Sequence, residues 1–285
     1  MISKEVLRKW NIGMSVIQAA VGGSLLYLYN DKGLLDTPTQ LTGTGVVKAP
    51  TSSGEFSLDW VQNEGSQVYI AREVIIFFFV TSFFHGLYAV MGESYDKLIK
   101  NGNNSLRWVE YSISATFMIR IVALQSGIRD QNTLTLITSS TIGIMLQGQI
   151  VEAALANNKG KLTSEQKSVV MTSTLIGWVL MIANFWVIIK QYMGLNDDID
   201  ALGCPGVEIP DFVLYIIITQ LIFYSTFGLI QIYQIYQRIN GKKVDYSNIE
   251  RMYLIDSLMS KVTLGGILGY AVTGADQGAY SPFTC

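Results

Sequence analysis

The residue with the clearest potential for chemistry is Lys261, near the middle of the apolar stretch 249–274. A charge at the centre of a membrane-spanning helix costs about 2.5–3.5 kcal/mol, so its presence indicates a function. A buried ammonium must either lose its proton or lie beside an anion. A lysine amine in such surroundings can also condense with an aldehyde to form a Schiff base. When protonated, that Schiff base needs a counterion.

Four further charges fall inside apolar stretches: Glu110, Arg120, Glu152 and Asp256. Glu110 is the best candidate for the anion beside Lys261. Ser257 precedes Lys261 by four residues, which places it on the same helix face one turn away, within reach of a hydrogen bond. Asp256 is about 140° around the helix from Lys261. We therefore expect Asp256 to face a different partner.

Three other polar residues have two interpretations each. Arg120 lies about 15 Å beyond Glu110 along a helix, where its side chain either extends to the interface or has a function. Glu152 lies near the end of its stretch, and a polar network and a simple interfacial position are equally open. His85 stands among phenylalanines, where a lone histidine is more often a satisfied core residue.

The elements that carry these residues are apolar stretches about as long as a membrane-spanning helix. Charged residues are 15% of the chain, against about 25% in soluble proteins, and the mean hydropathy is +0.33. These values predict an all-α membrane protein of one domain, 1–285. Its seven spans are 10–29, 74–94, 104–127, 132–156, 168–192, 210–237 and 249–274.

The same composition excludes several classes of protein. One His and two Cys exclude zinc fingers and HExxH metalloproteases, and no metal site is expected. A net charge of −2 provides no basic face, so no nucleic-acid partner is expected. The sequence contains no activated nucleophile or phosphate-binding loop, which predicts that the protein is not an enzyme.

The first connection, 31–73, is long and rich in Gly, Thr and Ser. Residues alternate partially in Gly43–Lys48 and Glu55–Val61, on either side of the turn region Pro50–Gly54. This pattern predicts a small β-hairpin outside the membrane.

Lys and Arg residues near the span ends predict the orientation. The side with the N-terminus holds thirteen: Lys4, Arg8, Lys9, Lys97, Lys100, Arg107, Lys159, Lys161, Lys167, Arg238, Lys242, Lys243 and Arg251. The other side holds five: Lys32, Lys48, Arg72, Arg129 and Lys190. The N-terminus is therefore expected in the cytoplasm and the C-terminus outside. Cys204 and Cys285 would then both lie outside, where a disulfide could form.

Two motifs resemble those of the heliorhodopsins, a family of inverted seven-helix retinal proteins. Residues 107–112 read Arg-Trp-Val-Glu-Tyr-Ser, similar to the family's RWVEYS element, and residues 257–261 are similar to its SLxxK element. Val207–Gln231 resembles the family's sixth helix, with Pro210 and Gln231 at matching positions. The likeness runs from about Trp10 to Gly274.

This resemblance implies a rhodopsin-like bundle in the lipid membrane, with a cytoplasmic N-terminus, an extracellular hairpin and a homodimeric assembly. It implies that Lys261 binds all-trans retinal covalently, which light converts to the 13-cis form. It also implies that Glu110 is the counterion and Ser257 a Schiff-base neighbour. Further pocket residues are expected at Tyr111, Ser114, Tyr224 and Phe227.

The resemblance further implies a proton network that contains His85, Glu152, Arg107, Gln18 and Ser15. The chain departs from the family at several positions. Ser15 stands where a second histidine is common, which puts a two-histidine proton acceptor in doubt. Arg120 and Asp256 are charges at usually apolar positions, Tyr224 replaces a phenylalanine, and Gln220 is an added polar group.

Two functions follow as hypotheses. The first is sensory signalling, in which isomerisation weakens the contact between the Schiff base and Glu110 and a proton leaves. An unidentified cytoplasmic partner would receive the signal. The alternative is light-activated proton transport or conduction, for which Arg120, Asp256 and Glu208 supply extra charged groups. A light-independent receptor or a small-molecule enzyme is a third class, and nothing in the sequence supports catalysis.

Overall fold

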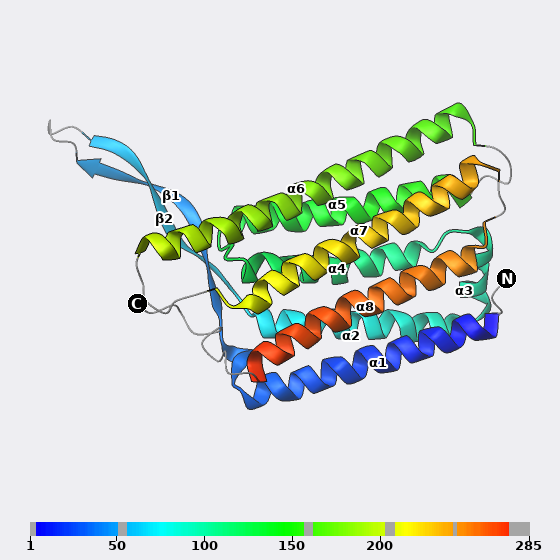
Figure 1. Ribbon diagram of the computed structural model, residues 1–285, viewed down its shortest axis with the longest axis horizontal. Helices are drawn as coiled ribbons and strands as arrows, with labels where there is room; N and C mark the ends of the chain where they lie inside the picture. Colours follow the sequence, from blue (N-terminus) through cyan, green and yellow to red (C-terminus); the bar gives the residue numbers. More distant parts are fainter. Residues whose placement is uncertain (1–3, 51–55, 157–161, 203–208, 242–243, 274–285) are drawn as a thin grey trace.

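The computed structural model describes residues 4–50, 56–156, 162–202, 209–241 and 244–273. In this part of the chain, seven long helices run side by side (Figure 1). Their bounds are α1 (Lys4–Asp31), α2 (Ile70–Met91), α4 (Ser105–Gln125), α5 (Gln131–Ala156), α6 (Ser164–Leu202), α7 (Asp211–Ile239) and α8 (Tyr246–Thr273). The expected all-α membrane bundle is confirmed.

The helices close into a ring in chain order. Each long helix packs on the next one, α8 packs on α1, and α4 also contacts α7 across the centre. The connections from α4 onward are short, which favours antiparallel neighbours, whereas the long connection from α1 to α2 contains the two β-strands. Inside this ring, side chains of α4 and α8 meet, although more than a hundred residues separate the two helices in the sequence.

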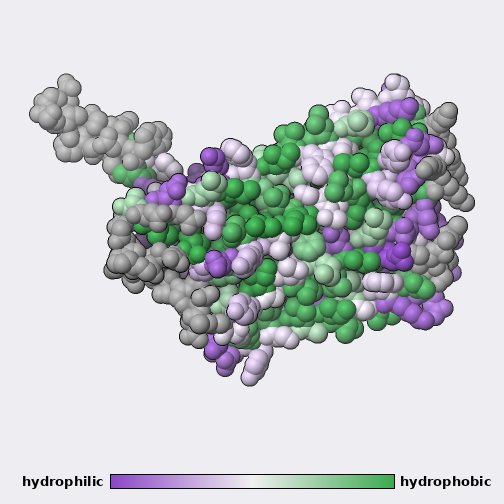
Figure 2. Space-filling view, viewed as in Figure 1, coloured by the Kyte–Doolittle hydropathy of each residue, from purple (hydrophilic) through white to green (hydrophobic). Residues whose placement is uncertain are grey.

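The outer surface of the bundle is apolar. Large side chains such as Val16, Leu136, Leu175 and Trp186 are 62% or more exposed, and hydrophobic residues form a wide belt between polar ends (Figure 2). Five of the described helices are long and apolar enough to cross a membrane; α4 and α8 are not among them. Both of these helices carry ionisable residues inside the bundle, which lower their hydropathy.

A short helix, α3 (Glu93–Asn101), crosses the end of the bundle where α1 begins (Figure 1). We call this the N-terminal end. The sequence pattern predicted one span to residue 94, but α2 ends at Met91. Gly92 and Gly102, with φ of 53° and 73°, bound α3 at its two ends. These are left-handed backbone angles that glycine adopts at little cost.

The opposite end carries the β-hairpin, and we call it the hairpin end. Strands β1 (Thr39–Pro50) and β2 (Phe56–Val68) pair antiparallel, from Thr39 opposite Val68 to Pro50 opposite Phe56. The hairpin projects beyond the helices (Figure 1). The expected hairpin is therefore confirmed, with strands longer than the alternation had suggested.

The hairpin is attached beside the start of α5. Thr42 N–H donates to the carbonyl of Arg129 at 2.8 Å. The next residue, Asp130, accepts from the backbone N–H and the hydroxyl of Thr133, both at 2.7 Å. These bonds cap the helix and hold the pKa of the Asp130 carboxyl below its usual range.

Helix α6 is longer than the expected span 168–192. Its 39 residues correspond to about 58 Å, nearly twice the roughly 30 Å of a bilayer's hydrocarbon core. Leu195 lies against Gly127, where an added Cβ would approach Leu195 Cδ2 to 2.9 Å. The positive φ of Gly127, 95°, also favours glycine at this contact.

Candidate functional site

The centre of the bundle holds a buried ion pair between α4 and α8. Lys261 Nζ donates to Glu110 Oε1 at 3.0 Å and to Ser257 Oγ at 2.8 Å. Lys261 is 2% exposed and Glu110 is 0% exposed. The ammonium also lies 5.2 Å from the ring centre of Tyr111. Glu110 and Ser257 are the two residues that the sequence had suggested as neighbours of Lys261.

Two hydroxyl groups orient the carboxylate. Thr81 on α2 donates to Glu110 Oε1 at 2.9 Å, and Ser114, one turn along α4, donates at 3.4 Å. Oε2 of Glu110 has no hydrogen-bond partner among the described residues. The carboxylate is therefore fixed through one oxygen, while the other is free to bind a proton or water.

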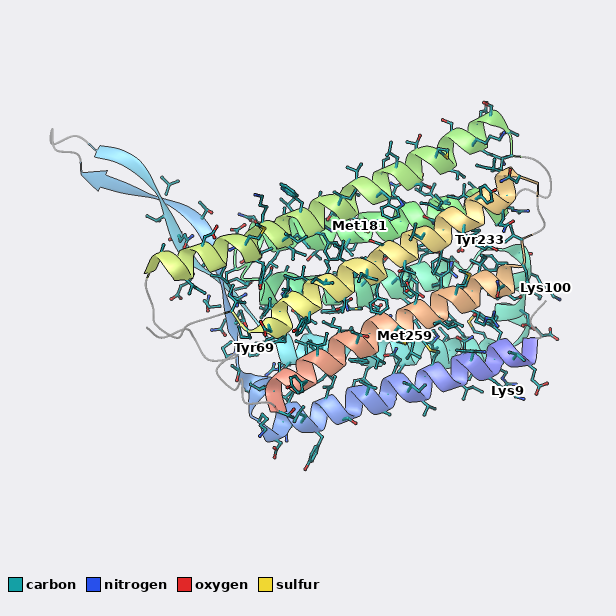
Figure 3. The ribbon with its side chains drawn as sticks, in the orientation of Figure 1. Lys9, Tyr69, Lys100, Met181, Tyr233 and Met259 are labelled. Atoms are coloured by element: carbon teal, nitrogen blue, oxygen red, sulfur yellow. The ribbon has the colours of Figure 1, made fainter. Side chains whose placement is uncertain are left out.

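A cavity extends from Lys261 between α4, α5, α6, α7 and α8, with an empty volume of about 790 Å³ that includes open solvent at its mouth. Met181, one of its lining residues, lies midway along the bundle (Figure 3). The lining is mainly apolar and aromatic. It includes Trp108, Tyr111, Ser114, Trp178, Tyr224, Phe227, Ser257 and Ser260.

Two glycines give the aromatic walls their positions. An added Cβ on Gly148 would lie 2.1 Å from the Trp108 ring, and one on Gly228 would lie 2.7 Å from the Trp178 ring. The indole of Trp108 also donates to Glu152 Oε2 at 2.7 Å, so it cannot turn away freely. Glycine at both positions therefore shapes the cavity.

Substitution of Gly148 by alanine is expected to lower stability by about 1–3 kcal/mol, because the Trp108 ring must leave its place. Thermal unfolding of the purified protein measures this. Gly143→Ala is the matched control on the same helix, since its Cβ would lie 3.5 Å from Leu180, an ordinary contact. Equal unfolding temperatures for the two variants would contradict the prediction.

A second buried charge cluster lies towards the N-terminal end, one turn before Glu110 on α4. Arg107 forms ion pairs with Glu152 on α5 and Glu250 on α8. The three side chains are 0–2% exposed. The guanidinium also lies 4.1 Å from the ring centre of Tyr253. Glu152 thus belongs to a buried polar network, which resolves the alternative left open by its position in the sequence.

Neutral groups complete this cluster. The Asn104 amide donates to Glu250 Oε1 at 2.7 Å, and Tyr95 OH donates to the same oxygen at 3.0 Å. Sequence reasoning missed Glu250 because it is the second residue of the expected span 249–274, where an acid suggests an interfacial position. Tyr95 was missed because α3 itself was not expected.

The remaining residues of the expected proton network lie between α1 and α2. His85 Nδ1 is 2.9 Å from Asn11 Oδ1, and its Nε2 has no hydrogen-bond partner in the described chain. Gln18 is fully buried, and neither of its polar side-chain atoms has a partner among the described residues. Ser15 instead bonds the carbonyl of Ser82 at 2.9 Å. No hydrogen bond joins these residues directly to Glu110 within the described segments.

The residues suggested for transport are dispersed. Arg120 pairs with Glu73, in the first turn of α2, at 3.0 Å, and its side chain is 28% exposed. Asp256 is 7% exposed, and its Oδ2 has no partner among the described residues. It does not line the cavity.

Glu208, Cys204 and Cys285 lie outside the described residues. No metal-binding group of His, Cys, Asp and Glu occurs within the described ranges.

The site thus combines a buried lysine on the last helix, a carboxylate on the third span in contact with it, and an apolar cavity that extends from the lysine. A sequence model of the heliorhodopsin family matches residues 7–271. The chain belongs to the heliorhodopsin family. It is therefore a multi-pass membrane protein of the rhodopsin type, and the family implies a retinal chromophore and a photoreceptor instead of a conventional enzyme.

Solved structures agree on the fold. The crystal structure of Exiguobacterium sibiricum rhodopsin is similar with a TM-score of 0.57 and 13% sequence identity, over 92% of this chain and 95% of that one. A light-driven proton pump from Leptosphaeria maculans has a TM-score of 0.53 and 11% identity, over 99% and 98%. No curated protein matches the heliorhodopsin chain in sequence.

The residues present fit the chromophore that the family implies. Retinal is a long apolar aldehyde, and the cavity has a mainly apolar lining that includes one lysine amine. Gly148 and Gly228 leave room for the rings of Trp108 and Trp178 to form flat walls. The donor set of one lysine and one carboxylate suits a covalently attached cation.

Proposed function

We propose that the protein is a light-absorbing photoreceptor in which Lys261 holds all-trans retinal as a Schiff base with Glu110 as the counterion. The observation that carries the proposal is the buried contact of Lys261 with Glu110 and Ser257 at the wall of the apolar cavity. A buried ion pair is weak evidence for stability. Its position at the cavity is what points to function.

Bound retinal would supply absorption of visible light and a change of shape from the all-trans to the 13-cis form. The chain's own residues then govern the proton at Lys261 Nζ. In the dark, Glu110 Oε1 accepts this proton in a charge-assisted hydrogen bond, and Thr81 and Ser114 hold that oxygen in place. Any movement of Nζ away from Oε1 weakens the bond.

Glu110 Oε2 and His85 Nε2 are the atoms best suited to receive the released proton. Both are buried, and both lack hydrogen-bond partners in the described part of the chain. Thr81 and His85 are one turn apart on the same face of α2. In this proposal the released proton moves towards the N-terminal end, where Asn11 holds the imidazole through Nδ1.

We propose that the N-terminal end faces the cytoplasm. Lys9, Lys97 and Lys100 are exposed there, and Lys9 and Lys100 both lie at that end in Figure 3. Positive side chains near span ends favour the cytoplasmic side. Sensory signalling through this face, from a homodimer to an unidentified cytoplasmic partner, is the form of the function that we favour.

Proton transport is the second candidate. The Glu73–Arg120 pair and the carboxyl of Asp256 place charged groups elsewhere inside the bundle. Voltage-clamp recording under illumination separates the candidates. A current at zero driving force would establish pumping, and a current whose reversal potential follows the pH gradient would establish conduction. Absence of current alongside a light-induced spectral change would support signalling.

The test of the photoreceptor proposal is a visible absorption spectrum of the protein expressed with all-trans retinal. A band that hydroxylamine bleaches in the light is expected, because hydroxylamine attacks Schiff bases. A folded protein that shows no visible band would contradict the proposal.

Replacement of Glu110 by glutamine is expected to move the band to longer wavelength. It should also lower, by about 1–2 units, the pH at which half of the band is lost, because a bond to a charged group contributes about 1.5–3 kcal/mol. An alkaline titration followed by absorbance measures both effects. Glu73→Gln, which removes a carboxylate from the separate ion pair between α2 and α4, is the control and should leave both values unchanged.

A further inference from the structure

A reciprocal pair of hydrogen bonds joins α7 to α8 beside Lys261. Gln220 Nε2 donates to the backbone carbonyl of Ser260 at 3.1 Å, and Ser260 Oγ donates to Gln220 Oε1 at 3.0 Å. Gln220 is 0% exposed and Ser260 is 4% exposed. A buried amide in an apolar interior is costly unless its groups are bonded, so this pair has a fixed geometry.

The two residues differ in their relation to the cavity. Ser260 lines it and is adjacent to Lys261 in the sequence, whereas Gln220 is not a lining residue. The hydrogen bonds to Ser260 connect Gln220 to the cavity wall. Its amide oxygen accepts the one hydrogen bond that the Ser260 hydroxyl can donate. Ser260 then has only oxygen lone pairs left to offer at the lysine end of the cavity.

We propose that Gln220 is a positioning residue that sets the absorption wavelength by holding the Ser260 hydroxyl with its negative oxygen available to the cavity. The inference rests on the proposed photoreceptor function. Light absorption by retinal moves positive charge away from the nitrogen and along the polyene. A negative oxygen near the nitrogen stabilises the state before absorption more than the state after it, and so shortens the wavelength.

Loss of this arrangement has a defined consequence. Without the Gln220 amide, the Ser260 hydroxyl becomes free to donate to a carbonyl of its own helix, as serines inside helices commonly do. Its orientation at the cavity then changes. The absorption maximum should move to longer wavelength, although no residue that lines the cavity has been replaced.

The experiment compares absorption maxima of purified, retinal-loaded variants. Gln220→Met removes both hydrogen bonds at similar volume, and Ser260→Ala removes the hydroxyl. Each is expected to shift the maximum to longer wavelength, and the double variant should shift it no further than Ser260→Ala alone. Gln220→Glu should restore the wild-type maximum, because a neutral carboxyl has one donor and one acceptor.

Asn184 provides the matched control. It is a buried amide with two hydrogen bonds that join α5 to α6, from Ser140 at 2.6 Å and to Thr141 at 3.1 Å. It does not line the cavity. Asn184→Leu should lower the unfolding temperature of the retinal-free chain, as Gln220→Met does, and leave the absorption maximum unchanged.

Several results would overturn the inference. A folded Gln220→Met variant with the wild-type maximum would do so, as would shifts that add in the double variant or a shift of equal size in Asn184→Leu. A visible band in the wild type with no effect of Gln220→Met contradicts this inference alone. No band in the folded wild type contradicts the photoreceptor function and this inference together.

Discussion

Replacement of Lys261 by alanine is expected to abolish the visible band entirely in protein supplied with all-trans retinal. The amine is the only covalent attachment point that the described cavity lining offers, since none of its other residues carries an amine. The change also leaves the Glu110 carboxylate buried without its cation. An absorption spectrum of the folded variant, beside the wild type, measures the effect.

Lys261→Arg separates attachment from charge. It retains a cation opposite Glu110 but cannot form the Schiff base, because a guanidinium stays protonated. Its band should be absent as well, while it should unfold at a higher temperature than Lys261→Ala. A visible band that persists in folded Lys261→Ala would show that retinal is attached elsewhere.

Replacement of Arg107 by methionine is expected to cause the largest loss of stability. Methionine fills much of the volume but leaves Glu152 and Glu250 buried without a cation. Removal of one partner from a buried ion pair costs about 3–5 kcal/mol. Thermal unfolding of the variant in the same detergent as the wild type measures this loss.

The exposed pair of Lys9 and Glu5 is the control for that prediction. Its nitrogen and oxygen are 2.8 Å apart, and its side chains are 71% and 76% exposed. Water screens such pairs, so Lys9→Met should have almost no effect on unfolding. If Arg107→Met and Lys9→Met unfolded at the same temperature, the proposed contribution of the buried cluster to stability would be wrong.

The sequence could predict the parts of the site that depend on one helix. Ser257 and Lys261 are four residues apart, and helical geometry alone places them on one face. Lys261 and Glu110 were linked by charge, because a buried cation needs an anion and few candidates lie deep within a span. The membrane bundle and the hairpin were likewise predictable from hydropathy and alternation.

The parts that depend on several helices could not be predicted. Thr81 looks like an ordinary residue of an apolar run, and only the packing of α2 on α4 brings it to Glu110. Glu73 and Glu250 lie near helix ends, where an acid usually faces water. Their partners, Arg120 and Arg107, belong to α4, so these pairs emerge only when the bundle closes. A one-helix pattern contains no information on such contacts.

Closure of the bundle has a consequence for how the chain enters the membrane during synthesis. Arg107 meets a first counter-charge on the very next helix, at Glu152, but Glu110 must wait for Lys261 on the last one. Until then, each unpaired charge opposes insertion by about 2.5–3.5 kcal/mol. Helix α4 is not among the helices apolar enough to cross a membrane by themselves, and we expect its insertion to be stabilised once α8 is present. We therefore expect biogenesis of this protein to end with the pairing of two charges on segments made at very different times.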